Sequence, residues 1–209
     1  MMTFSQPSIR ALGLVFLGIL TVSRVSAQGD PEPTYDYPTI LKGGFEIVYT
    51  VDAEFQYLHL KKGKRIIKEV ASTSRGLLHK NLGYVGADFM HSFALVHSYG
   101  SGNPHRVELI RKRDGKDLFA GGSMPCLVDA SERRSILITS DDCVPEVGDR
   151  IRLLNVLTGE EKYLSIPGFM FSENEVLSRI EIISTSARWL SLKFTSYDRS
   201  KIVVRKYRL

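Results

Sequence analysis

Short apolar runs separated by polar turns fill the chain from Thr39 to Leu209. The runs are rich in Val, Ile, Leu, Phe and Tyr, and the turns are rich in Gly, Asp, Asn and Ser. Such runs are typical of β-strands, and no long stretch shows a convincing helical period. We therefore expect strands in four groups, with these bounds: 45–50, 55–60 and 65–70; 83–89, 93–98, 106–111 and 117–120; 126–129, 135–140, 150–156 and 162–166; 177–183, 189–195 and 201–207.

One step recurs in all four groups, in which a basic residue followed by a β-branched residue opens a strand. The four copies are Arg65-Ile66, Arg106-Val107, Arg150-Ile151 and Lys201-Ile202, at intervals of 41, 44 and 51 residues. A turn glycine repeats with the middle pair, because Gly115 and Gly159 are also 44 residues apart. Repeats of about 40–50 residues are typical of propeller blades. We expect the four basic residues to occupy equivalent places in four similar sheets.

The strands at 135–139 and 150–154 lack a clean polar face. A strand that is covered on both faces has this composition, whereas a two-sheet sandwich shows stricter alternation. The pattern predicts an all-β, antiparallel fold of four blade-like repeats, which is a small or divergent β-propeller. A β-sandwich is the alternative.

Residues 123–166 carry a more specific pattern. Segments 129–134, 136–141 and 151–159 read Asp-Ala-Ser-Glu-Arg-Arg, Ile-Leu-Ile-Thr-Ser-Asp and Ile-Arg-Leu-Leu-Asn-Val-Leu-Thr-Gly. This order resembles a repeat of the periplasmic TolB-like propellers and the related peptidase propellers. The Trp-Ser-Pro-Asp-Gly turn of that family is absent, and Asp129-Ala130-Ser131-Glu132 stands in its place. The resemblance implies a blade-like β unit and says nothing about a reaction.

Four blades make the smallest propeller. The first and last groups lack a clear outer strand, so we expect 37–42 to pair beside 201–207 and to remove two open edges. The alternatives are an open sandwich and a half-propeller that completes itself by dimerising. The pattern leaves the oligomeric state open.

The N-terminus has the layout of a secretory signal peptide. Arg10 precedes the apolar run 11–20, and Val25-Ser26-Ala27 offers a cleavage site after Ala27. The apolar run is shorter than the roughly 20 residues that span a bilayer, and no later segment is long and apolar enough to do so. We predict a signal peptide at 1–27, a Pro-rich lead-in at 28–38 and one propeller-like domain at 39–209, exported to the periplasm or secreted. An uncleaved anchor is the alternative.

Charge and cysteine content refine this prediction. Loss of residues 1–27 removes two arginines and lowers the formal net charge from +5 to +3. Because this weak charge is interspersed, it does not predict a nucleic-acid partner. The only two cysteines, Cys126 and Cys143, lie near one end of a predicted hairpin. Export permits a disulfide between them, with free cysteines as the alternative.

No motif predicts a catalytic, metal or cofactor site. The chain has no His-Glu-x-x-His and no Gly-x-Ser-x-Gly. The acidic loop 141–149 matches no calcium loop, and its Pro and Gly favour ordinary turn chemistry. A catalytic set that only folding assembles is the alternative, and it would make the protein a secreted hydrolase or lyase.

The loops between second and third strands are the places where we expect recognition. In a blade architecture loops 61–64, 99–105, 141–149 and 197–200 emerge at one end, and loops on a rigid scaffold commonly carry binding. We therefore predict a non-enzymatic binding module for a protein, peptide or envelope polymer, of which an inhibitor or immunity protein is one form. The candidate surface residues are Tyr99, Asn103, His105, Asp142, Glu146 and Tyr197.

Overall fold

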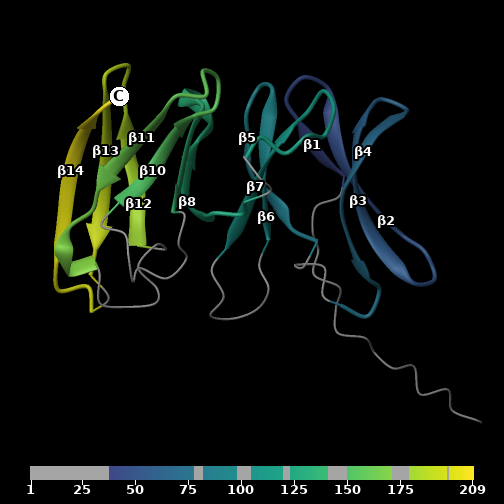
Figure 1. The fold of residues 1–209 in the computed structure, drawn as a ribbon, viewed down its shortest axis with the longest axis horizontal. Helices are drawn as coiled ribbons and strands as arrows, with labels where there is room; N and C mark the ends of the chain where they lie inside the picture. The colour runs from purple at the N-terminus through teal and green to yellow at the C-terminus, as the bar shows by residue number, and fades with distance from the viewer. Residues whose placement is uncertain are drawn as a thin grey trace, which may run out of the picture. The chain divides into compact units, whose positions relative to one another are not determined.

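The described part of the chain is built from antiparallel sheets. The computed structural model describes residues 38–77, 82–97, 105–119, 123–140, 150–170, 179–196 and 198–209. Within each of three sheets the strands follow one another in chain order (Figure 1). Short 3-10 turns at Glu132–Arg134 and Gly168–Met170 are present, and the described residues hold no α-helix. The all-β, antiparallel prediction is confirmed.

The strands have the following bounds. The first sheet comprises β1 (Thr39–Leu41), β2 (Phe45–Val51), β3 (Phe55–Lys62) and β4 (Arg65–Ser74). The second comprises β5 (Tyr84–Asp88), β6 (Ser92–His97), β7 (Arg106–Arg111), β8 (Cys126–Ser131), β9 (Ile136–Ser140), β10 (Arg150–Asn155) and β11 (Glu161–Ser165). The third comprises β12 (Ile180–Thr185), β13 (Trp189–Thr195) and β14 (Ile202–Arg208).

The seven-stranded sheet consists of two halves that meet at one residue pair. Strands β5 to β7 form one meander and β8 to β11 form another, and Arg106 opposite Cys126 is the only pair between β7 and β8. The strand groups of the structure are therefore β1–β4, β5–β7, β8–β11 and β12–β14. The predicted short strand at 117–120 is reduced to an isolated bridge between Ile110 and Asp117.

The predicted pairing of 37–42 with 201–207 is wrong. Strand β1 instead pairs with β2, with Leu41 opposite Phe45 across a turn of three residues. Gly43 and Gly44 in this turn have φ angles of 80° and 74°. Glycine adopts this left-handed region without steric cost, so the local hairpin forms and takes the strand away from the distant edge.

The extra strand also corrects the repeat assignment. Arg106 opens β7, the third strand of its group, and Arg150 opens β10, the third strand of its group. Ile202 begins β14, which is again a third strand, but Arg65 opens β4, the fourth strand of its sheet. Three of the four basic residues therefore occupy equivalent places, because the glycine turn adds β1 only to the first group.

The core lies between the sheets. Leu58 and Leu60 of the first sheet pack with Phe93 and Leu95 of β6. At the other end of the chain, a second cluster joins the third sheet to β9, β10 and β11, with members that include Leu192, Phe194, Ile138 and Leu153. Every residue of β6 and β9 is buried. The expected burial on both faces is confirmed for the strand at 135–139, whereas β10 keeps one face half-open, with Arg150 exposed and Arg152 half-buried.

The structure tests the prediction about membrane spans and does not describe the predicted signal peptide. Among the described residues, no helix reaches the length and apolarity that crossing a membrane requires. The predicted signal peptide at 1–27 lies outside the described residues, as does the lead-in except for Pro38.

Candidate functional site

Most of the predicted surface residues lie outside the described residues. These are Tyr99, Asn103, Asp142, Glu146 and Tyr197. The structure therefore places only His105 among the six predicted positions, together with the strand ends from which the loops depart.

Those strand ends form one continuous row across the sheet. The register sets His97 opposite Arg106, Arg106 opposite Cys126, and Cys126 opposite Ser140. Loop 98–104 leaves from His97, and loop 141–149 leaves from Ser140. Because neighbouring strands lie about 4.8 Å apart, His97 and Ser140, from which the two loops leave, are separated by roughly 14 Å. The two longest predicted binding loops thus start from neighbouring places on the sheet.

His105 is held beside this row by Tyr84. The Tyr84 hydroxyl lies 3.0 Å from His105 Nδ1, and the two rings meet edge to face with centroids 6.2 Å apart. The backbone is fixed as well, because Leu127 N donates to His105 O at 2.7 Å. Burial raises the pKa of Tyr84. A half-buried phenol and an exposed imidazole are therefore presented together from a fixed backbone.

Ionisable groups also gather within the sheet near this row. His97 is 5% exposed, and its Nε2 lies 2.8 Å from Glu108 Oε1. Burial raises the pKa of Asp117, and the Glu108 carboxylate raises it further. The sequence alone does not reveal this pair, because the carboxylate comes from the neighbouring strand. Strand pairing, which places Leu95 opposite Glu108, is the signal that would have found it.

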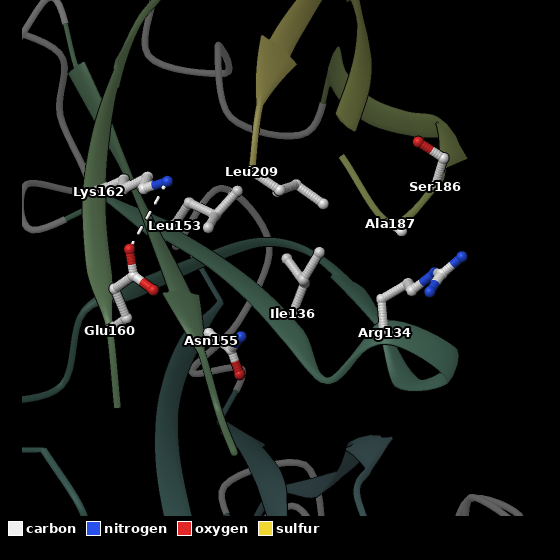
Figure 2. A pocket seen from close by; sticks show the side chains of 9 residues that line it. All are labelled: Arg134, Ile136, Leu153, Asn155, Glu160, Lys162, Ser186, Ala187 and Leu209. Atoms are coloured by element: carbon white, nitrogen blue, oxygen red, sulfur yellow. Dashed lines mark ion pairs between the residues drawn. The ribbon is translucent and has the colours of Figure 1, made fainter. Parts of the chain in front are cut away.

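A cavity lies at the opposite end of β9 from loop 141–149 (Figure 2). It has a volume of about 330 Å³ and is lined by residues that run from 134 to 209: Arg134, Ile136, Leu153, Asn155, Glu160, Lys162, Ser186, Ala187 and Leu209. Figure 2 shows the apolar Ile136, Leu153 and Leu209 between Arg134 on one side and the Lys162–Glu160 pair on the other. The ion pair measures 3.6 Å between Nζ and Oε1. Sequence reasoning missed this cavity because its walls come from four distant segments.

The same end of the molecule holds a buried lysine. Lys112 is 1% exposed, and its Nζ lies 2.6 Å from Asp88 Oδ1. It also donates to the carbonyls of Phe89 at 2.6 Å and Lys42 at 2.9 Å. A lysine is almost never fully buried unless its charge is paired, so the ion pair with Asp88 and the two carbonyl acceptors account for its position.

Asp88 and Glu132 extend this network across three turns. Asp88 Oδ2 accepts from Lys42 N at 2.7 Å, and Asp88 N donates to Glu132 Oε1 at 2.8 Å. Lys42 Nζ pairs with Glu132 Oε2 at 2.6 Å. Partial burial by itself would raise the pKa of Glu132, but the hydrogen bonds from Lys42 and Asp88 outweigh it, and the pKa is lowered. The network ties the β1–β2, β5–β6 and β8–β9 turns together and is a structural feature.

The disulfide stays a prediction. Cys126 is fully buried at the start of β8, opposite Ser140. Cys143 follows Ser140 by three residues and lies outside the described residues. The register thus places Cys126 at the strand end from which the segment with Cys143 departs.

In the part of the chain that the structure describes, no group of three or more His, Cys, Asp or Glu residues is arranged to hold a metal ion. Comparison with protein-family models, with curated proteins and with solved structures finds no match to this chain.

Proposed function

We propose that this chain is an exported, non-enzymatic binding module that recognises a protein, a peptide or an envelope polymer. The observation that carries the proposal is the row from His97 to Ser140, which brings the starts of loops 98–104 and 141–149 together. Four of the six predicted surface residues belong to these loops, and His105 adjoins them. A rigid sheet that projects neighbouring loops is a common arrangement for recognition.

The Tyr84–His105 pair gives this surface a fixed element. Aromatic rings with a polar tip are enriched at interfaces, because they combine a large apolar area with one directed hydrogen bond. The cavity of Figure 2 offers a second place for a ligand at the opposite strand ends, with an apolar floor and charged walls. Both sites suit a mixed polar and apolar partner such as a polypeptide.

The blade-like arrangement is part of the same proposal. In a propeller the first strand of each blade lies near the first strands of its neighbours. Here Lys42 N, just after β1, donates to Asp88 of β5, and Ile182 N of β12 donates to Asp129 Oδ2 of β8 at 2.6 Å. The Asp88–Glu132 bond joins the ends of β5 and β8 in the same way. These contacts support a divergent propeller whose first group has an added strand.

Export rests on the signal-peptide layout of residues 1–27, and it would permit a disulfide between the two cysteines. The weak, interspersed net charge supports partners other than nucleic acid. Inhibition of a secreted toxin or hydrolase is one form that such recognition would take.

A secreted hydrolase or lyase is the second candidate, and one observation favours it. The His97–Glu108 contact of 2.8 Å and the raised pKa of Asp117 place a base and two carboxyl groups near the binding row. Perturbed ionisable groups gather at catalytic sites, although structural ion pairs produce the same pattern.

One experiment separates the two functions. The double variant H105A/D142A, the variant E108Q and the control H91A are each used for affinity capture from envelope extract and for hydrolysis of peptide and glycan substrates. His91 is an exposed histidine in the β5–β6 turn, at the other end of β6 from loop 98–104. We expect H105A/D142A to lose a partner that the wild type and H91A retain, with no hydrolysis by any form.

Two results would decide against the binding module. Hydrolysis by the wild type that E108Q abolishes would establish the enzyme instead. Retention of every captured partner by H105A/D142A would show that the loop row is not the recognition surface.

A further inference from the structure

Among the described residues, the first and third sheets each pack one face on a core cluster. On the first sheet, Ile47, Leu58 and Leu60 point into the cluster that they share with β6 and β7. On the third sheet, Leu192 and Phe194 point into the cluster that they share with β9 and β10. Because side chains alternate along a strand, the intervening residues of both sheets lie on the opposite faces, where most are exposed or half-buried and Ser191 is buried.

The uncovered face of the third sheet is here called face C. Along β14 every second residue is exposed: Ile202, Val204, Lys206 and Arg208. The register sets them opposite Thr195, Lys193, Ser191 and Trp189 of β13. Ile202, Val204 and Trp189 are 61%, 51% and 49% exposed. Single exposed apolar side chains are ordinary, but face C carries three: Ile202 and Val204 are successive on this side of β14, and Trp189 lies farther along the face, opposite Arg208.

The uncovered face of the first sheet is here called face A. Its residues come from all four strands: Ile40, Glu46, Val48, Thr50, Phe55, Tyr57, His59, Lys61, Ile66 and Glu69. Phe55, Tyr57 and His59 form a ladder of rings along β3, with centroids 6.3 and 5.8 Å apart. Ile40 and Ile66 are both more than half exposed. Face A is therefore also apolar and aromatic.

The charges on the two faces are complementary. On face C, Glu181 pairs with Lys193 at 2.6 Å, which leaves the cations of Lys206 and Arg208 without an ion pair among the described residues. On face A, Glu46 pairs with Lys61 at 3.2 Å, which leaves the carboxylate of Glu69 without an ion pair among the described residues. The pKa of Tyr57 is raised to about 12, mainly by its hydrogen bond to Asp52. The Glu69 carboxylate also contributes to this rise, so Glu69 lies close to Tyr57 on this face. Beyond its ion pair, face C therefore carries the two cations Lys206 and Arg208, and face A carries the single carboxylate of Glu69.

The free edge of β14 is a less suitable contact than its face. Edge strands are protected from unwanted pairing by charged side chains, and β14 carries Arg205, Lys206 and Arg208 in four residues. On its inner side, Tyr207 OH donates to Ser165 O at 2.7 Å, which holds β14 against the second sheet. The part of β14 that is best suited to contact a partner is therefore its side of face C.

We propose that face C of one copy packs on face A of a second copy, so that two copies form a closed dimer. Each copy has one of each face, and two copies are the smallest assembly of separate chains in which every face C meets a face A. Propellers hold about 4 to 8 blades, and two copies of four strand groups stay within that range. Because the contact joins different faces, it is head to tail, and the two-fold ring closes it.

Surface charge substitutions test the proposal on the whole chain. I202E/V204E places two carboxylates on face C, and F55E/I66E places two on face A. The matched control L157E/Y163E changes two apolar residues that are more than half exposed and lie on neither face. Mass is measured by sedimentation equilibrium at tens of micromolar, and circular dichroism confirms that each variant is folded. If a double variant is unfolded, the single changes V204E and I66E replace it.

We expect the wild type and the L157E/Y163E control to have twice the mass of one chain, and each face variant to have the mass of one chain. An equimolar mixture of the two face variants should recover a dimer, because one intact face C then meets one intact face A. A monomeric wild type would overturn the proposal. So would a face variant that still dimerises alone, a mixture that stays monomeric, or a wild-type assembly larger than a dimer.

Discussion

Replacing Lys112 with Met should destabilise the protein strongly. Methionine preserves most of the buried stem but removes the ammonium group. Asp88, whose side chain is 14% exposed, then loses its cation, and the Phe89 and Lys42 carbonyls lose a donor. Breaking a buried ion pair by removing one partner costs about 3–5 kcal/mol. Domains of this size are stable by roughly 5–15 kcal/mol, so the loss is a large fraction of the total.

The magnitude follows from the three contacts. An unsatisfied buried acceptor costs about 1–3 kcal/mol, and more when it is charged. In K112M the Asp88 carboxylate keeps one hydrogen bond, from Lys42 N to Oδ2. The loss of unfolding free energy should therefore be about 4 kcal/mol, within the roughly 3–5 kcal/mol expected for a broken buried pair. The double variant K112M/D88N removes both charges. It should be less unstable than the two single changes predict together, because the variants share one interaction.

The assay is urea unfolding followed by circular dichroism. With a slope of about 2 kcal/mol per molar urea, the K112M midpoint should fall by roughly 2 M. Lys116, an exposed lysine four residues further on, supplies the control K116M, which should change stability by no more than about 0.5 kcal/mol. A K112M midpoint equal to that of K116M would refute the assignment of Lys112 to a buried pair that stabilises the fold.

Two further predictions concern turns: the repeated turns of Gly115 and Gly159, and the β13–β14 turn that holds Asp198. Gly115 and Gly159 both have positive φ, but a Cβ on Gly115 would overlap a lysine stem of β4, whereas nothing lies within 4 Å at Gly159. G159A should therefore cost about 1–2 kcal/mol from backbone strain, and G115A about 1–3 kcal/mol more from overpacking; equal midpoints in urea would contradict this. Hydrogen bonds from Ser196 and then Ser200 lower the pKa of Asp198 from 3.8 to about 2, so its contribution is present above pH 3.8 and is lost as the pH falls through about 2. In a carboxyl NMR titration S196A should move this midpoint upward, and an unchanged midpoint would show that the Ser196 bond is not its cause.

The fold class was predictable because strand signals are local. Apolar runs bounded by turn residues located every group of strands, and β9 is buried throughout, as its lack of a polar face indicated, although β10 keeps one face half-open. The pairing of β1 was not predicted, because two arrangements were compatible with its composition. Gly43 and Gly44 favour the hairpin, because they form a tight turn without steric strain and closing this short loop costs less entropy than pairing with the far end of the chain.

The candidate site was predictable only in part. Loops 99–105 and 141–149 could be named from composition, but they depart from one row of strand ends because Arg106 pairs with Cys126, a contact between groups that no local pattern encodes. Lys112 shows the same limit. In sequence it belongs to a basic run before Asp114, which is typical of a solvated turn, and only the fold reveals that it is buried against Asp88.

The join between β7 and β8 has a consequence for how the chain gains its stability. A ladder of one residue pair transmits little cooperativity, so the two halves of the second sheet depend on side-chain contacts to stay together. Stability in such chains approximates a sum of unit and nearest-neighbour terms, as in repeat proteins. The outermost units then have a single neighbour and open first, which makes partial unfolding from either end the lowest-energy route to exposed strand edges.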